Sequence, residues 1–169
     1  MWLIKADDRA LAVDEHFYHQ VIGEVYRHKV MFVISQSDKA EPTSVNGQLS
    51  MAQKQNVSRK ICLLHELFQP VHPVCAVSVR LQWGLQVMAE RIIKCLPREA
   101  TSPVVSQLQH PFRTAAVQEK ARDDFGETVG AVLDTVSAFP LIPAPVRAVI
   151  QAVRNTVVSV ARTVWDFFF

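Results

Sequence analysis

A run of apolar residues that ends in a polar turn, Val30–Lys39, constrains the fold of this chain more than any other segment. Such a run is typical of a strand that is buried on both faces of a parallel sheet, and polar side chains at its carboxyl end commonly face a ligand. Asp38 is the one carboxylate in the turn, and its two oxygens can accept two N–H donors from one planar partner, such as the edge of a guanine base. An aspartate here could instead cap a following helix by accepting from its backbone amides, and this segment alone leaves both interpretations open.

Two further apolar runs, Trp2–Ile4 and Val71–Val79, are predicted to be strands. Because strands and helical segments alternate, the sequence predicts an α/β fold with a parallel sheet. Pro73 places the third strand at a sheet border, and Trp2–Ile4 is predicted to form an open edge to which a protein partner could bind. Apolar residues at helical spacing predict three helices, which cover residues 9–27, 49–68 and 84–96.

This order of elements resembles the second half of an Era-like GTP-binding protein of the TRAFAC class, with closest likeness to GTPase-family proteins carried by enterobacterial prophages. Asp38 stands where the family's N-K-x-D motif for guanine recognition ends, and Ser35 and Gln36 stand at the first two positions of that motif. Ser78 and Val79 stand where the family's S-A motif backs the base. The resemblance implies a truncated P-loop GTPase-like, Rossmann-like half-sheet with flanking helices and a guanine-recognition region at these five residues.

The chain departs from the family pattern in ways that bear on activity. Ser35 is shorter than the family's asparagine, Gln36 replaces its lysine, and Asp38 alone keeps its chemical role. The motif G-x-x-x-x-G-K-[ST] occurs nowhere in the 169 residues, although a phosphate loop needs it for close backbone approach to phosphate. Phosphoryl transfer depends on that loop and its Mg²⁺. The prediction is a remnant that is not an enzyme, binds GTP or GDP weakly at best and hydrolyses neither.

The composition changes after Pro97. Residues 1–96 are predicted to form the GTPase-like half-domain, residues 97–111, rich in Pro, Ser and Gln, to form a linker, and residues 112–169 to form an α-helical hairpin. In the second arm of the hairpin, arginines fall on or near one face and valines recur opposite them. Arginines also interrupt every apolar run before it is long enough to span a membrane. The arginines are Arg147, Arg154 and Arg162, and the valines are Val149, Val153, Val157, Val160 and Val164.

Three roles for this hairpin stay open. It could pack against the sheet or against itself, it could lie on a membrane surface through an amphipathic helix at Val146–Phe169, or it could bind a partner protein. The alternative to a GTPase remnant is therefore a non-catalytic interaction module. Such a module would bind a protein or a membrane surface through the edge strand Trp2–Ile4 or through the C-terminal helix.

Composition excludes several other functions. The net charge of +2 and the scattered basic residues argue against DNA binding. The cysteines show no C-x-x-C spacing, and no basic segment precedes a long apolar core as in a signal peptide, so a cytoplasmic protein is predicted. His16 and His19 share a helical face, but no further ligands face them in the pattern, so no metal site is predicted.

Overall fold

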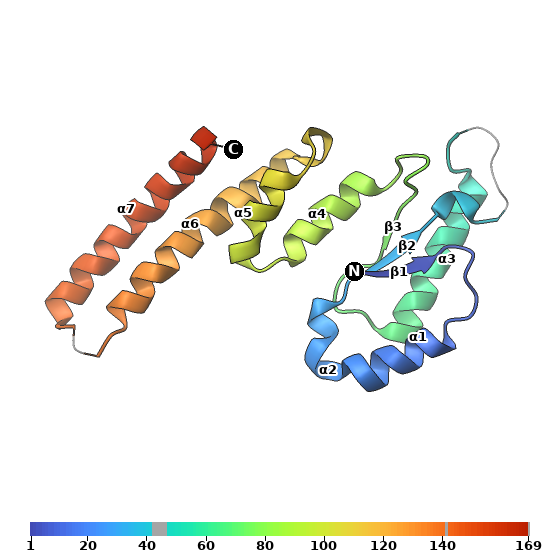
Figure 1. The fold of residues 1–169 in the computed structure, drawn as a ribbon, viewed down its shortest axis with the longest axis horizontal. Helices are drawn as coiled ribbons and strands as arrows, with labels where there is room; N and C mark the ends of the chain where they lie inside the picture. Colours follow the sequence, from blue (N-terminus) through green and yellow to red (C-terminus); the bar gives the residue numbers. More distant parts are fainter. Residues whose placement is uncertain (42–46, 141, 169) are drawn as a thin grey trace. The chain divides into compact units, whose positions relative to one another are not determined.

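The computed structural model describes residues 1–41, 47–140 and 142–168, and the chain divides into two compact units, Met1–Ile92 and Ile93–Phe169. Most of the described residues are helical, and a small parallel sheet lies in the first unit (Figure 1). Each unit has its own cluster of buried apolar side chains. The sequence also predicts a Pro/Ser/Gly loop at residues 41–47 between the second strand and the next helix, and most of that segment lies outside the described residues.

Three strands form the sheet in the order β1 (Trp2–Lys5), β2 (Phe32–Ser35) and β3 (Cys75–Ala76), and both pairings are parallel. Phe32, Val33 and Ile34 are fully buried, as expected for the central strand of a parallel sheet. The third strand is shorter than the predicted run because the chain leaves the sheet soon after Ala76, and Ser78 pairs with Trp83 in an antiparallel bridge.

Strand β1 lies at one edge of this sheet. The backbone N–H groups of Trp2 and Ala6 donate to Met31 and Ser35, so the groups of the intervening Leu3 and Lys5 point away from β2. Leu3 is 61% exposed, and the predicted open edge is therefore confirmed for the described sheet. The edge is only four residues long and carries the exposed Lys5, and both features limit pairing with another chain.

The segment predicted as one helix over residues 9–27 is broken into short pieces. A π-helical turn, η1 (Tyr18–Ile22), follows α1 (Ala12–Phe17) and precedes α2 (Gly23–Tyr26) and the 3₁₀ turn η2 (Arg27–Lys29). Helix α3 (Met51–Phe68) is regular, because Ser50 and Gln53 form a reciprocal capping box at its start. Helix α4 (Leu85–Cys95) is tied to the sheet by Arg91, which donates to the Val74 carbonyl oxygen at 2.7 Å.

Three aromatic rings form the centre of the first core. The Phe32 ring centroid lies 4.7 Å from that of Phe68 and 5.1 Å from that of Tyr18, and none of the three residues is exposed. Strand β2, helix α3 and the turn η1 therefore meet on one face of the sheet. Burial raises the pKa of the Tyr18 hydroxyl, which has no hydrogen-bond partner among the described residues.

The second unit is helical and includes the segment predicted as a linker. Helix α5 (Arg98–Gln107) and the 3₁₀ turn η4 (His110–Phe112) occupy most of residues 97–111, which differs from the prediction. Thr101 donates to the Asp124 carboxylate at 2.7 Å, and Ser102 donates to the Ala121 carbonyl oxygen at 3.1 Å. Hydroxyl residues of the segment predicted as a linker are therefore used in packing α5 against α6 (Ala115–Ser137).

The predicted helical hairpin is present. Helix α6 is followed by a connection that contains Pro140 and Pro143, and then by α7 (Ala144–Phe168), as Figure 1 shows. Phe169 and the side chain of Phe168 lie outside the described residues. None of the described helices is both long and apolar enough to cross a membrane.

Candidate functional site

The structure brings two of the predicted site residues together. Asp38 lies in the 3₁₀ turn η3 (Ser37–Lys39) after β2, and Ser78 lies two residues after β3. The Ser78 hydroxyl donates to the Asp38 carboxylate at 2.6 Å, and an Arg80 nitrogen lies 3.9 Å from the second carboxylate oxygen. The carboxyl ends of neighbouring parallel strands therefore place these groups in contact.

In this arrangement the Asp38 carboxylate accepts a hydrogen bond from another side chain of the protein. Its acceptor Oδ1 holds Ser78, whose own oxygen accepts from the backbone N–H of Leu81, so the carboxylate stabilises the loop that follows β3. The Gln53 side chain donates to the carbonyl oxygens of Asp38 and Ala40, both at 3.0 Å. The alternative of a helix cap is not observed, since no backbone N–H among the described contacts donates to the Asp38 carboxylate. The side chain is only 12% exposed.

The other three predicted residues do not converge on Asp38. The Ser35 hydroxyl donates to the Ile4 carbonyl oxygen at 3.5 Å, and Val79 is 75% exposed. Gln36 adopts a left-handed backbone conformation with φ of 55°, and its side-chain oxygen is buried without a described partner. The five residues therefore do not form one pocket among the described residues.

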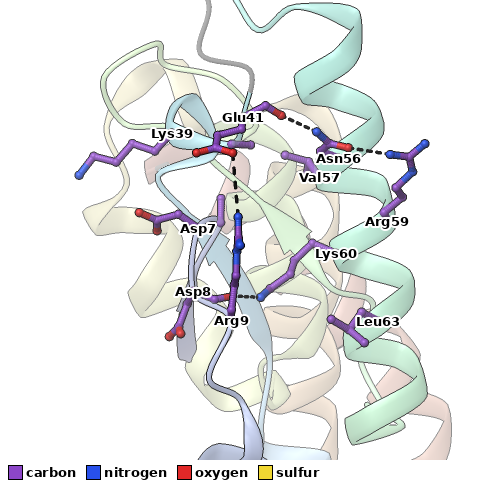
Figure 2. Close-up of a pocket in the computed structure, with 12 residues that line it drawn as sticks. Asp7, Asp8, Arg9, Lys39, Glu41, Asn56, Val57, Arg59, Lys60 and Leu63 are labelled. Atoms are coloured by element: carbon purple, nitrogen blue, oxygen red, sulfur yellow. Dashed lines mark hydrogen bonds and ion pairs between the residues drawn. The ribbon is translucent and has the colours of Figure 1, made fainter.

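A different cavity lies at the carboxyl ends of β1 and β2. It has a volume of about 610 Å³ and is walled by the polar turn after β1, by the residues after η3 and by one side of α3 (Figure 2). None of the predicted site residues lines it. The sequence signal that could have indicated it is the polar turn Lys5–Asp8 after the first apolar run, together with the polar positions of α3 that face it, Asn56 and Lys60.

Charged groups of both signs surround this cavity. Lys60 donates to the Asp8 carbonyl oxygen, and Asn56 donates to the Glu41 carbonyl oxygen (Figure 2). Arg9 and Glu41 lie 4.0 Å apart with side chains 90% and 82% exposed, so that ion pair contributes little to stability. The lining residues include no Ser, Thr, Cys or His, and the described part of the chain has no cluster of three or more residues that could hold a metal. These lining side chains therefore supply no nucleophile of the Ser, Thr or Cys type.

Partial burial lowers the pKa of Lys60 below 10.5, although Asp8 and Asp7 oppose the shift. Because the native state releases this proton at a lower pH than the unfolded state, the stability contribution of Lys60 rises with pH between its native pKa and 10.5. After reductive methylation with ¹³C-formaldehyde, we expect the Lys60 signal to titrate below the pH at which dimethylated free lysine titrates. A Lys60→Arg variant identifies the signal. Titration at or above the pH at which dimethylated free lysine titrates would contradict the lowered pKa of Lys60.

The second unit contains a second candidate site, the outer surface of the hairpin on which valines of α7 are exposed. The charged side chains of α7 make their contacts on other sides of the helix. Arg154 donates to Asp134 at 2.8 Å and to Glu127 at 3.0 Å, and these hydrogen bonds raise the pKa of Arg154. Arg162 lies 3.3 Å from Asp123, and Asp166 lies 3.7 Å from Arg122. Arg147 donates to the Ile142 carbonyl oxygen at 3.4 Å.

Two glycines of α6 allow the arginines to lie against it. A Cβ atom at Gly126 would stand 2.9 Å from Arg162 Cγ, and one at Gly130 would stand 2.8 Å from a Val158 methyl carbon. The side chains of α7 therefore cross close to the α6 backbone, where they reach the acidic residues. This packing reverses the simplest expectation for an amphipathic helix, since the arginines face inward.

Valines occupy the outward side. We call the exposed set the valine face; its members on α7 are 42–62% exposed, and the two on α6 are 64% and 46% exposed. The ion pairs show that α6 and α7 are antiparallel, and with 3.6 residues per turn the exposed valines of each helix fall on its side away from the other helix. The valine face consists of Val132 and Val136 of α6 and Val146, Val149, Val153, Val160 and Val164 of α7.

The chain thus combines a small parallel α/β unit with a helical unit that exposes an uncharged apolar surface. It belongs to the family of the putative uncharacterized protein YeeP of Escherichia coli strain K12, to which it is 43% identical over 173 residues, covering all of this chain and 72% of YeeP. The uncharacterized proteins YkfA and YfjP of the same organism are 88% and 82% identical over 169 residues. The chain spans 59% of the length of YkfA and of YfjP.

These comparisons correct the resemblance stated above. No family model and no solved structure matches the chain, and the names of its relatives do not mention a GTPase. The identification as the C-terminal part of an Era-like GTP-binding protein was therefore wrong. It relied on the order of elements and on two short motifs; in the first of these only Asp38 keeps the family's chemical role, and that carboxylate is engaged by Ser78 within the chain.

Proposed function

We propose that this chain is a non-catalytic interaction module that binds a protein partner through the valine face of its helical hairpin. The observation that supports this proposal is the distribution of charge on α7. Its four charged side chains are directed to α6 or to the connection before α7, while five of its valines are left 42–62% exposed. An exposed apolar patch of this size on a folded protein marks an interaction surface.

The same charge distribution favours a protein partner over a membrane surface. An interfacial helix gains affinity for anionic lipids from Lys and Arg that border its apolar face. In this hairpin Arg154 and Arg162 are paired with the acidic residues Asp134, Glu127 and Asp123, so their charge is offset within the protein. Apart from Arg147 and Asp166, the other exposed residues of α7 are uncharged, and most of them are valine, alanine, serine or threonine, which suit packing against another apolar helix.

The valine face is also a better candidate than the edge of the sheet. Strand β1 offers only the backbone groups of two residues, and the charged Lys5 lies on it. The valine face extends from Val146 to Val164, about 27 Å along α7 at the rise of an α-helix. The longer surface can bury more apolar area, and burial of apolar area is the main favourable term in most protein associations.

Site-specific photo-crosslinking tests this proposal. A photoreactive phenylalanine analogue replaces Val153 in the chain expressed in Escherichia coli, and the matched control places it at the neighbouring Ala152, which is exposed on another side of α7. We expect an adduct with a polypeptide from position 153 and little or none from position 152. Adducts with lipid only, or equal polypeptide adducts from both positions, would argue against a protein partner at the valine face.

A further inference from the structure

The valine face has a property that points to the identity of its partner: it is complementary to itself. A two-fold interface brings the same patch of two copies together, so any charge on the patch meets its own image or a neighbour of like sign. The seven residues of the valine face are uncharged, and Arg154, Arg162 and Asp166 are held against α6. Two valine faces can therefore meet without electrostatic repulsion.

We propose that the partner is a second copy of this chain, and that two hairpins pair through their valine faces to form a dimer with a four-helix core. This inference rests on the proposed function and specifies its partner. The core of the assembly would contain α6 and α7 of both copies, with the arginine ion pairs inside each hairpin unchanged.

The spacing of apolar residues agrees with packing between helices. Along α7 the apolar positions 146, 150, 153, 157, 160 and 164 follow one another at intervals of four and three residues, which is the pattern of a helix-bundle seam. Ile150 and Val157 are partly buried within the hairpin, and the valines at the other four positions are exposed. Each helix therefore carries more apolar surface than its contact within one hairpin covers.

The area and composition of the valine face fit a dimer. The five valines of α7, each about half exposed, present on the order of 400 Å² per copy, so that two copies bury on the order of 800 Å², which is in the range of a weak, reversible interface. Interfaces between identical subunits are more apolar than those between different proteins.

Sedimentation equilibrium of the purified full chain tests the inference. We expect a mass of twice 19.0 kDa that dissociates on dilution. A Val153→Glu variant places a carboxylate in the paired surface, and we expect its dimer dissociation constant to rise by about a hundredfold or more. The matched control Ala152→Glu adds the same charge on another side of the helix and should leave the dissociation constant within about threefold. Circular dichroism shows whether each variant keeps its helices.

The outcomes separate this inference from the proposed function. A wild-type chain that stays monomeric up to about 100 μM would overturn the dimer, as would equal weakening by Val153→Glu and Ala152→Glu. If position 153 still forms an adduct with a different polypeptide in cells, the interaction module stands and its partner is another protein. If position 153 forms adducts with neither itself nor another polypeptide, both proposals fail.

Discussion

A Gly84→Ala variant is expected to lose at least about 3 kcal/mol of the free energy of unfolding of the first unit. Gly84 has a φ of 75°, and a Cβ atom there would stand 2.2 Å from the carbonyl oxygen of Ala76 in β3. That oxygen belongs to backbone and cannot turn away as a flexible side chain can. The Val77 N–H donates to the Ile34 carbonyl oxygen at 2.8 Å, so a shift of this segment would break its bond to β2.

The matched control for this prediction is Gly23→Ala. Gly23 also has a positive φ, of 56°, but a Cβ atom there would meet nothing within 4 Å. This variant therefore reports the cost of the backbone conformation alone, which at a φ of 56° and a ψ of −173° is about 1–3 kcal/mol. Urea denaturation followed by tryptophan fluorescence measures both variants. Equal losses in the two variants would show that the close approach of Gly84 to β3 does not stabilise the fold.

A Phe68→Ala variant is expected to lose about 3–5 kcal/mol of the free energy of unfolding. Phe68 is fully buried, and its ring centroid lies 4.7 Å from that of Phe32 and 5.6 Å from that of Tyr18. Removal of the ring leaves a cavity between α3 and the sheet, and the two remaining aromatic rings lose a shared neighbour. The loss follows from both the apolar area returned to water and the cavity that the core cannot fill.

The control for Phe68 is a second aromatic truncation in the same unit. Tyr26 is 52% exposed and contacts the Lys29 ammonium over its ring at 5.3 Å. We expect Tyr26→Ala to lose less than about 1 kcal/mol, because most of its ring is already in water. Chemical denaturation at several wavelengths gives both values. A loss from Phe68→Ala no larger than that from Tyr26→Ala would contradict the central place of Phe68 in the core.

Much of the secondary structure was predictable because its cause is local. The apolar spacing in residues 49–68 and 84–96 agrees with α3 and α4 to within a few residues. The helix predicted at 9–27 failed as a single element, since the chain contains a π-helical turn at Tyr18–Ile22 that brings the Tyr18 ring onto Phe32. Apolar periodicity does not encode such a turn, because it depends on contacts with β2 and α3.

The contact between Asp38 and Ser78 was also predictable, since parallel strands end at the same edge of a sheet. The structural role of that contact could not be predicted. The sequence placed a possible ligand acceptor at Asp38, but the loop after β3 turns Ser78 toward it and occupies its oxygen at 2.6 Å. Loop geometry of this kind depends on groups distant in sequence, including the close approach of Gly84 to Ala76.

The hairpin shows most clearly where local pattern ends and three-dimensional packing begins. Spacing alone established that α7 has an arginine side and a valine side, because helical periodicity places residues on faces. It did not establish which side turns inward. The three-dimensional structure set the arginines against Glu127, Asp134 and Asp123 beside two glycines of α6, and left the valines outside. The physical reason is that ion pairs and close packing form between residues of two different helices. The side of α7 that turns inward therefore depends on the residues of α6 as well as on those of α7.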